Sequence, residues 1–295
     1  MNNVELAQIN QHALDKRAIM HKIKVEDEFL KLSKTHPYYG YVEVSISMVP
    51  SFLMFYNNDD VVARKFFWNG SDAYEATSLT LWAALSKNAH IILDIGSYTG
   101  IYSFVAAASN PVAKVHAFEG LDRVYNRLLI NKLVNKFTNI YTYNYVASNT
   151  SGISEFNIYS GESILVSGST ILPKDQLSRP IHETKVVKSI RIDEVFSTDS
   201  ISLIKIDTEG AEHLVLEGMK NILNTNSPDI LIEILSDAQY SIVEKYLPSS
   251  KYNYYSINEE SRKLTPIKNL KETVELGNLN TLITTKSLDY LSKLL

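Results

Sequence analysis

The sequence predicts an α/β protein with a mostly parallel sheet of seven strands, helices on both faces of the sheet and an antiparallel edge strand. From residue 90 onward, short apolar runs alternate with segments of helical spacing, which is the pattern of strand–helix–strand units. After Pro248 two strand-like runs follow, which favours a mixed sheet edge. The composition, 45% hydrophobic and 21% charged over 295 residues, is that of a folded globular protein and excludes a globally disordered chain.

The individual elements follow from these patterns. Apolar runs of strand length predict strands at 91–95, 114–118, 140–146, 202–207, 230–234, 251–257 and 279–285. Helical spacing between them predicts helices at 102–108, 122–135, 212–223 and 237–247. We expect this domain to span residues 71–295 and to begin with a helix over 73–85.

Residues 1–70 are expected to form an α+β extension, and a second irregularity interrupts the main domain. Apolar spacing over 4–32 indicates one or two amphipathic helices, and the run over 41–56, broken by Pro50, indicates a strand pair. The amphipathic segment is expected to pack on the main domain or on a second copy, which would make a homodimer. The insertion at about 148–189 is expected to hold a hairpin around Ile153–Ile158. Its Ser-rich loop over 160–170 is either an acceptor lid or a mobile connection.

Charge and composition exclude several function classes. The formal net charge is −4 and no block of Lys and Arg is present, which argues against nucleic acid as a partner. The lack of cysteine excludes disulfides and thiolate chemistry. The first residues contain no apolar core of a secretory signal, and the apolar runs are too short to span a bilayer. We therefore expect a cytoplasmic protein with no membrane span.

The strongest local signal is IILDIGSYTGIYSF, an apolar strand that reaches Asp94, a loop with Gly96 and Gly100, and then a helix. In open α/β sheets, ligands bind beyond the carboxyl ends of the strands, and glycine lets the backbone approach them closely. The next strand is followed by Glu119, which is placed to accept hydrogen bonds from ribose hydroxyls. Because the third glycine of a dinucleotide site is missing, the sequence predicts a nucleoside ligand without a diphosphate.

The segments DIGSYTGIYSF, VHAFEG and LIKIDTEGAEHLVLEGM resemble the motifs of the FkbM family of S-adenosylmethionine-dependent methyltransferases, over roughly residues 70–235. The resemblance implies a Rossmann-like class I methyltransferase fold and S-adenosylmethionine as the cofactor. It implies that Glu119 binds the ribose and that a helix opened by Glu75 closes over the methionine end. The cofactor-binding residues predicted in this way are Glu75, Asp94, Gly96, Ser97, Tyr98, Gly100, Glu119, Gly120, Ala147, Ser148 and Asp207.

The segment IKIDTEGAEH follows the fourth strand and brings four polar side chains to the mouth of the predicted cleft. A hydroxyl is a poor nucleophile at neutral pH, so methyl transfer to it needs near-collinear alignment and a group that takes the proton. Asp207, Glu209 and His213 are the catalytic candidates, whereas Glu212 fits the first turn of a helix, where acids are favoured. Glu233 could complete a carboxylate set for a metal, but no metal-binding motif accompanies it and no metal site is predicted.

These observations favour an enzyme that methylates a hydroxyl of a sugar, glycan or small metabolite. Two alternatives remain open at this point. A non-catalytic module could keep the fold and the cofactor site without turnover, and an NAD-dependent oxidoreductase could use the same architecture. The missing third glycine argues against the oxidoreductase.

Overall fold

The central sheet has the mixed, mostly parallel topology that the sequence predicts. The computed structural model describes residues 2–20, 26–159, 165, 169–177, 180–196, 200–235 and 237–295. The strands of the sheet are β3 (Ile91–Ile95), β4 (Lys114–Phe118), β5 (Ile140–Tyr143), β10 (Leu203–Ile206), β11 (Asp229–Glu233), β12 (Asn253–Asn258), β13 (Lys263–Ile267) and β14 (Asn280–Thr284). Their order is β13-β12-β14-β11-β10-β3-β4-β5, and the five strands β11, β10, β3, β4 and β5 run parallel to one another.

The sheet has eight strands, where the sequence predicts seven. The additional strand is β13, which forms an antiparallel hairpin with β12 and lies at the sheet edge. The other antiparallel strand, β14, is inserted between β11 and β12. Its neighbours cover it on both sides, so its residues Asn280–Thr284 are all buried. The prediction missed β13 because KLTPI is short, largely exposed and interrupted by Pro266.

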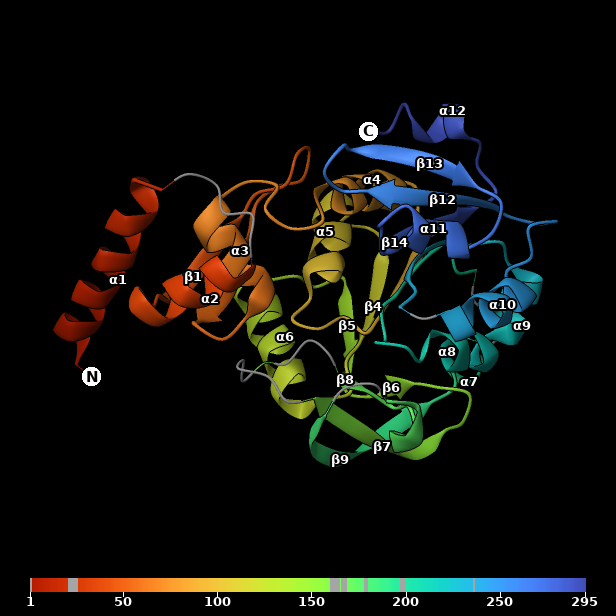
Figure 1. The fold of residues 1–295 in the computed structure, drawn as a ribbon, viewed down its shortest axis with the longest axis horizontal. Coiled ribbons are helices and arrows are strands. Elements are labelled where there is room, and N and C mark those ends of the chain that lie inside the picture. The colour runs from red at the N-terminus through yellow and green to blue at the C-terminus, as the bar shows by residue number, and fades with distance from the viewer. Residues whose placement is uncertain are drawn as a thin grey trace.

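Two hydrophobic cores lie on the two faces of this sheet, because successive side chains of a strand point to opposite sides. On one face Ile92 and Leu203 pack with α4 (Ala76–Ser86), α5 (Ile101–Ser109) and α6 (Asp122–Val134). On the other face Leu93 and Ile204 pack with α7 (Ile192–Val195), α8 (Glu212–Gly218), α9 (Lys220–Thr225) and α10 (Asp237–Tyr246). Figure 1 shows these helices around the central strands.

The N-terminal elements lie beside the sheet, at the left in Figure 1. They are α1 (Asn3–Ala18), α2 (Glu26–Thr35), β1 (Tyr39–Val44), β2 (Phe52–Asn57) and α3 (Val61–Asn69). The strands β1 and β2 form the expected antiparallel pair. Helix α3 was not predicted, and its first turn is capped by the Asp60 carboxylate, which accepts a hydrogen bond from the Ala63 amide at 2.9 Å.

Side-chain amides of α6 and of its C-cap residue fix β2 to the main domain. The Asn131 Oδ1 accepts a hydrogen bond from the Phe55 amide at 2.7 Å. Asn135 pairs with both backbone groups of Leu53, each at 2.7 Å. A free strand edge leaves backbone donors and acceptors without partners, so these two asparagines take the place of a neighbouring strand.

The insertion forms a small sheet of its own, with the order β6-β9-β7-β8. Its strands are β6 (Val146–Ala147), β7 (Gly152–Tyr159), β8 (Ser169–Thr170) and β9 (Ile181–Ile190). The local hairpin expected around Ile153–Ile158 is therefore wrong, because this segment is one strand whose main partner is the distant β9. The predicted strand 140–146 is likewise divided between β5 and β6. Of the Ser-rich lid predicted over 160–170, only Leu165, Ser169 and Thr170 belong to the described residues.

The remaining elements are short. They are the 3-10 turn η1 (Lys174–Gln176) and the helices α11 (Lys271–Glu275) and α12 (Leu288–Leu291). Among the described residues, none of the helices combines the length and the apolar character needed to cross a membrane.

Candidate functional site

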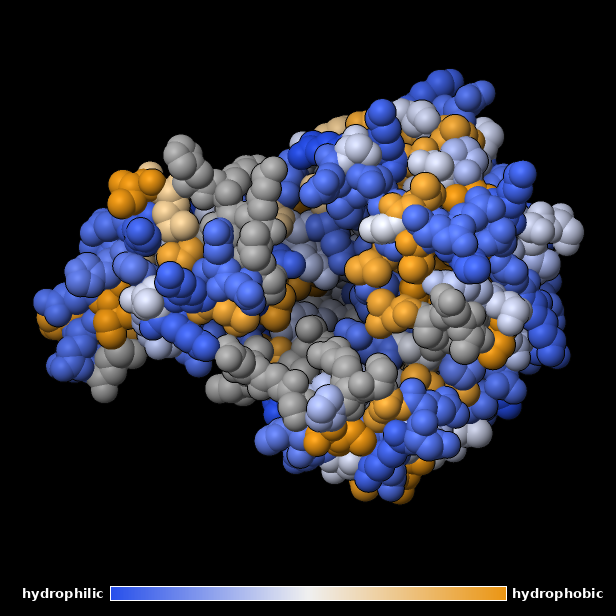
Figure 2. Space-filling model, in the orientation of Figure 1, coloured by the Kyte–Doolittle hydropathy of each residue, from blue (hydrophilic) through white to orange (hydrophobic). Residues whose placement is uncertain are grey.

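A cavity of about 340 Å³ lies at the carboxyl ends of β3, β4, β10 and β11. Its size falls within the range of about 300–1,000 Å³ that is typical of small-molecule sites. Figure 2 shows a hollow near the centre of this face, beside the N-terminal elements. The cavity brings together most of the predicted site residues, namely Glu75, Asp94, Gly96, Ser97, Tyr98, Glu119, Gly120, Ala147, Asp207 and Glu209.

Three predicted residues, all in the described part of the chain, do not line this cavity. A Cβ at Gly100, where φ is +104°, would lie 2.5 Å from the Leu128 Cδ1, so this glycine is needed for helix packing. The Ser148 amide donates to the Ile190 carbonyl at 3.0 Å, which ties Ser148 to the insertion sheet. His213 lies on α8, where burial lowers the pKa of its imidazole. The cofactor contacts predicted for Gly100 and Ser148 and the catalytic role predicted for His213 therefore stay predictions, and none of these residues lines the cavity.

The loop after β3 is packed tightly against the loop after β10. Gly96 has φ +79°, and a Cβ at this position would lie 1.7 Å from the backbone oxygen of Asp207. The amides of Gly96 and Ser97 donate to the Phe118 carbonyl at 3.0 and 2.9 Å. These bonds tie the three strand ends together, so the two sequence motifs meet at one place because glycine allows the contact.

Asp94 and Glu119 supply buried carboxyl groups on neighbouring strands. Asp94 is 1% exposed and accepts a hydrogen bond from the Ser103 hydroxyl at 2.6 Å. Glu119 is 8% exposed and accepts one from the Leu121 amide at 2.8 Å. Burial raises the pKa of Asp94 to about 6 and that of Glu119 to about 7. Both groups line the cavity, so a ligand with hydrogen-bond donors or positive charge would stabilise their ionised forms.

A buried lysine, to which the sequence patterns assign no role, is part of the cavity lining. Lys205 is 1% exposed, and its ammonium lies 3.3 Å from the Asp207 carboxylate and 3.3 Å from the Asn280 Oδ1. It also lies 5.0 Å from the centre of the Tyr102 ring. Burial alone would lower the pKa of Lys205, but the surrounding carboxylates raise it, so the ammonium form is retained. The signal in the sequence was a single lysine inside the apolar run LIKI.

Glu233 ends β11 beside this ion pair. Ile206 and Ile232 are partners in the parallel ladder, so Asp207 and Glu233 occupy equivalent positions at the ends of adjacent strands. Burial and the nearby Asp207 raise the pKa of Glu233 to about 9, although Lys205 acts in the opposite direction. Among the described residues, no grouping of His, Asp and Glu has the arrangement of a metal site.

The residues just before α4 supply another part of the cavity wall. Glu75 lines the cavity and accepts a hydrogen bond from the Tyr102 hydroxyl. The first turn of α4 is capped from a distance, because the Glu259 carboxylate accepts hydrogen bonds from the Thr77 amide and the Ser78 hydroxyl. Since Glu259 provides this cap, Glu75 does not have to serve as the capping side chain and can face the cavity.

Glu212 has the structural role that the sequence suggests. Its Oε1 accepts hydrogen bonds from the Thr208 amide at 3.1 Å and from the Gly210 amide at 3.0 Å. It thereby shapes the loop that carries Asp207 and Glu209, and Glu209 itself has a φ of +54° within this loop. Asp207 and Glu209 both line the cavity as predicted.

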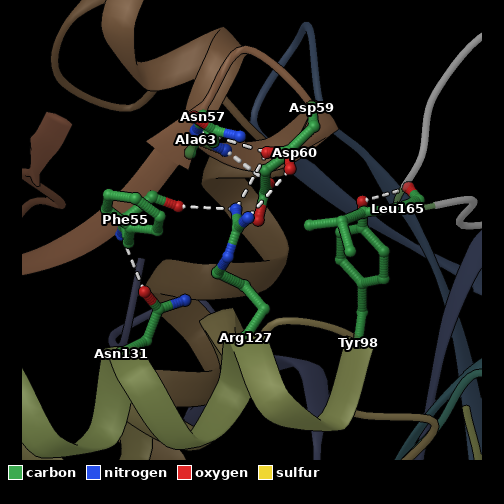
Figure 3. Close-up of polar contacts among 9 residues, drawn as sticks. All are labelled: Phe55, Asn57, Asp59, Asp60, Ala63, Tyr98, Arg127, Asn131 and Leu165. Atoms are coloured by element: carbon green, nitrogen blue, oxygen red, sulfur yellow. Dashed lines mark hydrogen bonds and ion pairs between the residues drawn. The ribbon is translucent and has the colours of Figure 1, made fainter. Parts of the chain in front are cut away.

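The N-terminal elements complete the wall of the cavity. Val61, Val62 and Lys65 of α3 line it. Figure 3 shows how this wall is held, because Arg127 of α6 forms a bidentate pair with Asp59 at 2.9 and 2.8 Å. These three lining residues were not predicted, because the sequence patterns indicated no helix between the strand pair over 41–56 and the helix over 73–85.

Tyr98 connects the loop after β3 to the insertion. Its hydroxyl donates to the Leu165 carbonyl at 2.7 Å, and Figure 3 shows its ring directed toward Leu165. Tyr98 has a φ of +48°, an uncommon conformation for a residue with a bulky side chain. The same residue therefore lines the cavity and contacts the insertion.

The sequence model of the FkbM methyltransferase domain matches residues 94–276, which is more than half of the chain. The chain belongs to the FkbM methyltransferase family. The matched region contains every element of the cavity floor, from Asp94 on β3 to Glu233 on β11. The residues of α3 and the start of α4, which close the cavity, precede the matched region.

Several solved structures are similar to this FkbM-family chain. An FkbM methyltransferase from Methylobacillus flagellatus is 15% identical, with a TM-score of 0.43, and the match covers 66% of this chain and 43% of that one. This chain thus spans less than half the length of that protein. A SAM-dependent methyltransferase from Agrobacterium tumefaciens is 13% identical, with a TM-score of 0.44 and coverage of 84% and 71%. A SAM-dependent O-methyltransferase from Thermotoga maritima is 11% identical, with a TM-score of 0.41 and coverage of 84% and 92%. No curated protein matches the sequence.

Proposed function

We propose that this FkbM-family protein transfers the methyl group of S-adenosylmethionine to a hydroxyl group of a sugar, glycan or small metabolite. The observation that carries the proposal is the pair of buried carboxyl groups, Asp94 and Glu119, on adjacent strand ends of one cavity. Glu119 is suited to accept hydrogen bonds from ribose hydroxyls. Gly96 and Ser97 would lie against the same ligand between the two carboxyl groups.

The charge of the cavity supports a cationic cofactor without phosphate. The lining residues carry six carboxyl groups, from Glu75, Asp94, Glu119, Asp207, Glu209 and Glu233, and two ammonium groups, from Lys65 and Lys205. An excess of carboxylates attracts a sulfonium ion and repels the pyrophosphate of a dinucleotide. When bound, S-adenosylmethionine supplies an electrophilic methyl group, and the chain's own residues bind it, orient it and exclude water.

The acceptor would enter from the side of the N-terminal extension. We propose that residues 1–70 form a unit that shapes the acceptor end of the cavity, since Val61, Val62 and Lys65 border it there. This wall thus offers two apolar side chains and one ammonium group to the acceptor. A homodimer through the extension stays a prediction.

Isothermal titration calorimetry tests the proposal directly. S-adenosylhomocysteine should bind and NAD should not, and E119Q should weaken S-adenosylhomocysteine binding by about tenfold, because a hydrogen bond to a charged group contributes about 1.5–3 kcal/mol. E260Q is the matched control, because Glu260 is exposed outside the cavity. Binding of NAD in preference to S-adenosylhomocysteine would contradict the proposal.

A further inference from the structure

The Glu233 carboxyl group lies between two polar residues of neighbouring strands. These are Asp207, which forms an ion pair with Lys205, and Asn280. In the parallel ladder of β10 and β11, Asp207 and Glu233 follow the last paired residues, Ile206 and Ile232. In the antiparallel ladder of β11 and β14, Glu233 is the partner of Asn280. Glu233 thus lies between Asp207 and Asn280 at the carboxyl end of β11, and it lines the cavity.

The buried ammonium of Lys205 contacts the two residues on either side of Glu233. Its contacts, each at 3.3 Å, are the Asp207 carboxylate and the Asn280 Oδ1. The Asp207 carboxylate, whose side chain is 24% exposed, therefore has a fixed counter-charge. Glu233 shares the field of the same ammonium, but Lys205 cannot neutralise both carboxylates.

The surroundings of Glu233 favour its protonated form when the cavity holds no cation. The titratable groups that face it are Asp207, Glu209 and Lys205 from β10 and its following loop, and Tyr74 and Glu75 from the segment before α4. Burial is the main cause of its raised pKa of about 9, and the carboxylates of Asp207, Glu75 and Glu209 add to it. At neutral pH, Glu233 therefore carries a proton that a positive charge in the cavity would displace.

We propose that Glu233 is the proton acceptor of the methyl-transfer reaction, and that Asp207 is the lysine-bound anion beside it. This inference rests on the proposed function. Glu233 gives up its proton to solvent when the cationic cofactor binds, and it takes the acceptor's hydroxyl proton when that positive charge is lost. Asp207, which the sequence interpretation favoured, then positions Lys205 and maintains the charge of the site.

The proposed step conserves atoms and charge. The hydroxyl O–H bond breaks and its proton passes to the Glu233 carboxylate, while the oxygen forms a bond to the methyl carbon. The carbon–sulfur bond breaks and its electron pair stays on sulfur. One positive charge and one carboxylate charge disappear together, so the charge of the cavity does not change between the ligand-free, cofactor-bound and product states. A low-dielectric site favours such a balance, because it avoids an uncompensated buried charge.

The test compares two probes that differ in the charge on sulfur. S-adenosylmethionine and S-adenosylhomocysteine are titrated into the full chain by calorimetry at about pH 7.5, in two buffers of different ionisation enthalpy, so that the protons released are counted. The wild type should release on the order of one proton more with S-adenosylmethionine than with S-adenosylhomocysteine. Proton release that the shared nucleoside causes at Asp94 or Glu119 is common to both probes and cancels in the difference, and E233Q identifies the group that responds to the charge on sulfur.

Two variants locate the released proton. E233Q should abolish the difference in proton release and weaken S-adenosylmethionine binding by about tenfold or more, while S-adenosylhomocysteine binding stays near that of the wild type. Glutamine mimics the protonated carboxyl group, so this variant should fold, and retained S-adenosylhomocysteine binding confirms it. E209Q is the matched control, because Glu209 is a carboxyl group in the same cavity. It should keep the difference in proton release.

The possible outcomes separate the two proposals. If both probes bind and release equal numbers of protons, or if E233Q keeps the difference, Glu233 is not the proton acceptor and the proposed function stands. If neither probe binds to the wild type, the proposed function fails and this inference fails with it. A difference that is lost in E233Q and kept in E209Q supports the assignment.

Discussion

The α-carbon of Gly96 faces the backbone carbonyl of Asp207 so closely that a Cβ would lie 1.7 Å from its oxygen. Gly96 belongs to the loop that borders the proposed cofactor, and Asp207 belongs to the loop that borders the proposed acceptor. The contact therefore couples the two halves of the cavity. It also explains why a glycine stands at a position with φ +79°.

Substituting Gly96 should damage both stability and the site. We expect G96A to lower the free energy of unfolding by about 3 kcal/mol, because the new Cβ meets backbone that cannot move without displacing the Asp207 loop. G277A is the matched control, because Gly277 also has a positive φ, +73°, but a Cβ there would meet no atom within 4 Å. The control should lose only the conformational cost of about 1–2 kcal/mol. Urea unfolding of the two variants checks this, and equal losses would show that the close contact is unimportant.

The ion pair between Arg127 and Asp59 should hold the N-terminal wall of the cavity in place. Both side chains are buried, at 9% and 7% exposure, and Arg127 also donates to the Phe55 carbonyl at 3.0 Å. Removing one partner leaves a buried charge uncompensated, so R127M should cost about 3–5 kcal/mol. Faster hydrogen exchange at the Phe55 amide, measured by NMR, is the expected signature.

An exposed ion pair provides the comparison for R127M. Lys271 and Glu275 lie 3.5 Å apart with side chains that are 59% and 58% exposed. K271M should therefore change the free energy of unfolding by less than about 1 kcal/mol and leave exchange at Phe55 unaltered. If R127M resembled K271M in both measurements, the N-terminal elements would be held by apolar packing alone.

Stability should fall as the pH rises through the range in which the buried carboxyl groups ionise. Their pKa values are raised to about 6 for Asp94, about 7 for Glu119 and about 9 for Glu233, whereas the unfolded chain titrates near about 4. Between these values the native state binds more protons than the unfolded state, so the free energy of unfolding decreases with pH. Each such proton contributes a slope of up to about 1.4 kcal/mol per pH unit.

E233Q should flatten the alkaline part of this profile. Glutamine cannot ionise, so the loss of stability between about pH 7 and pH 9 should largely disappear in this variant, while a shallower decline caused by Asp94 and Glu119 remains at lower pH. Thermal unfolding across this range measures the effect, with E260Q as a surface control. A wild-type protein that is more stable at pH 9 than at pH 6 would show that these carboxyl groups are ionised in the ligand-free fold.

Local patterns in the sequence were sufficient to predict those parts of the fold that depend on residues close together in the chain. The strands β3 and β4 occur at the predicted residues, since apolar runs with clear ends define them. The site residues Asp94 and Glu119 followed from the same strand ends. The family assignment rested on three motifs that surround one cavity.

The parts that were missed depend on contacts far apart in the sequence. Lys205 became important only because Asn280, which is 75 residues later, accepts its hydrogen bond beside Asp207. β9 is stabilised by its pairing with β7, and its polar, alternating residues gave no apolar run. Local periodicity contains no information on these two pairings. Helix α3 was missed for a different reason: its cap Asp60 is a local contact, but it lies in a cluster of Asn and Asp that is typical of a turn.

A crystal structure of the complex with S-adenosylhomocysteine would show where the proposed cofactor binds. The ribose hydroxyls should contact the Glu119 carboxylate, the nucleoside should lie against Gly96 and Ser97, and the sulfur should face the side of Asp207 and Glu233. A ligand bound elsewhere, or a cavity that stays closed to the ligand at saturating concentration, would contradict this placement.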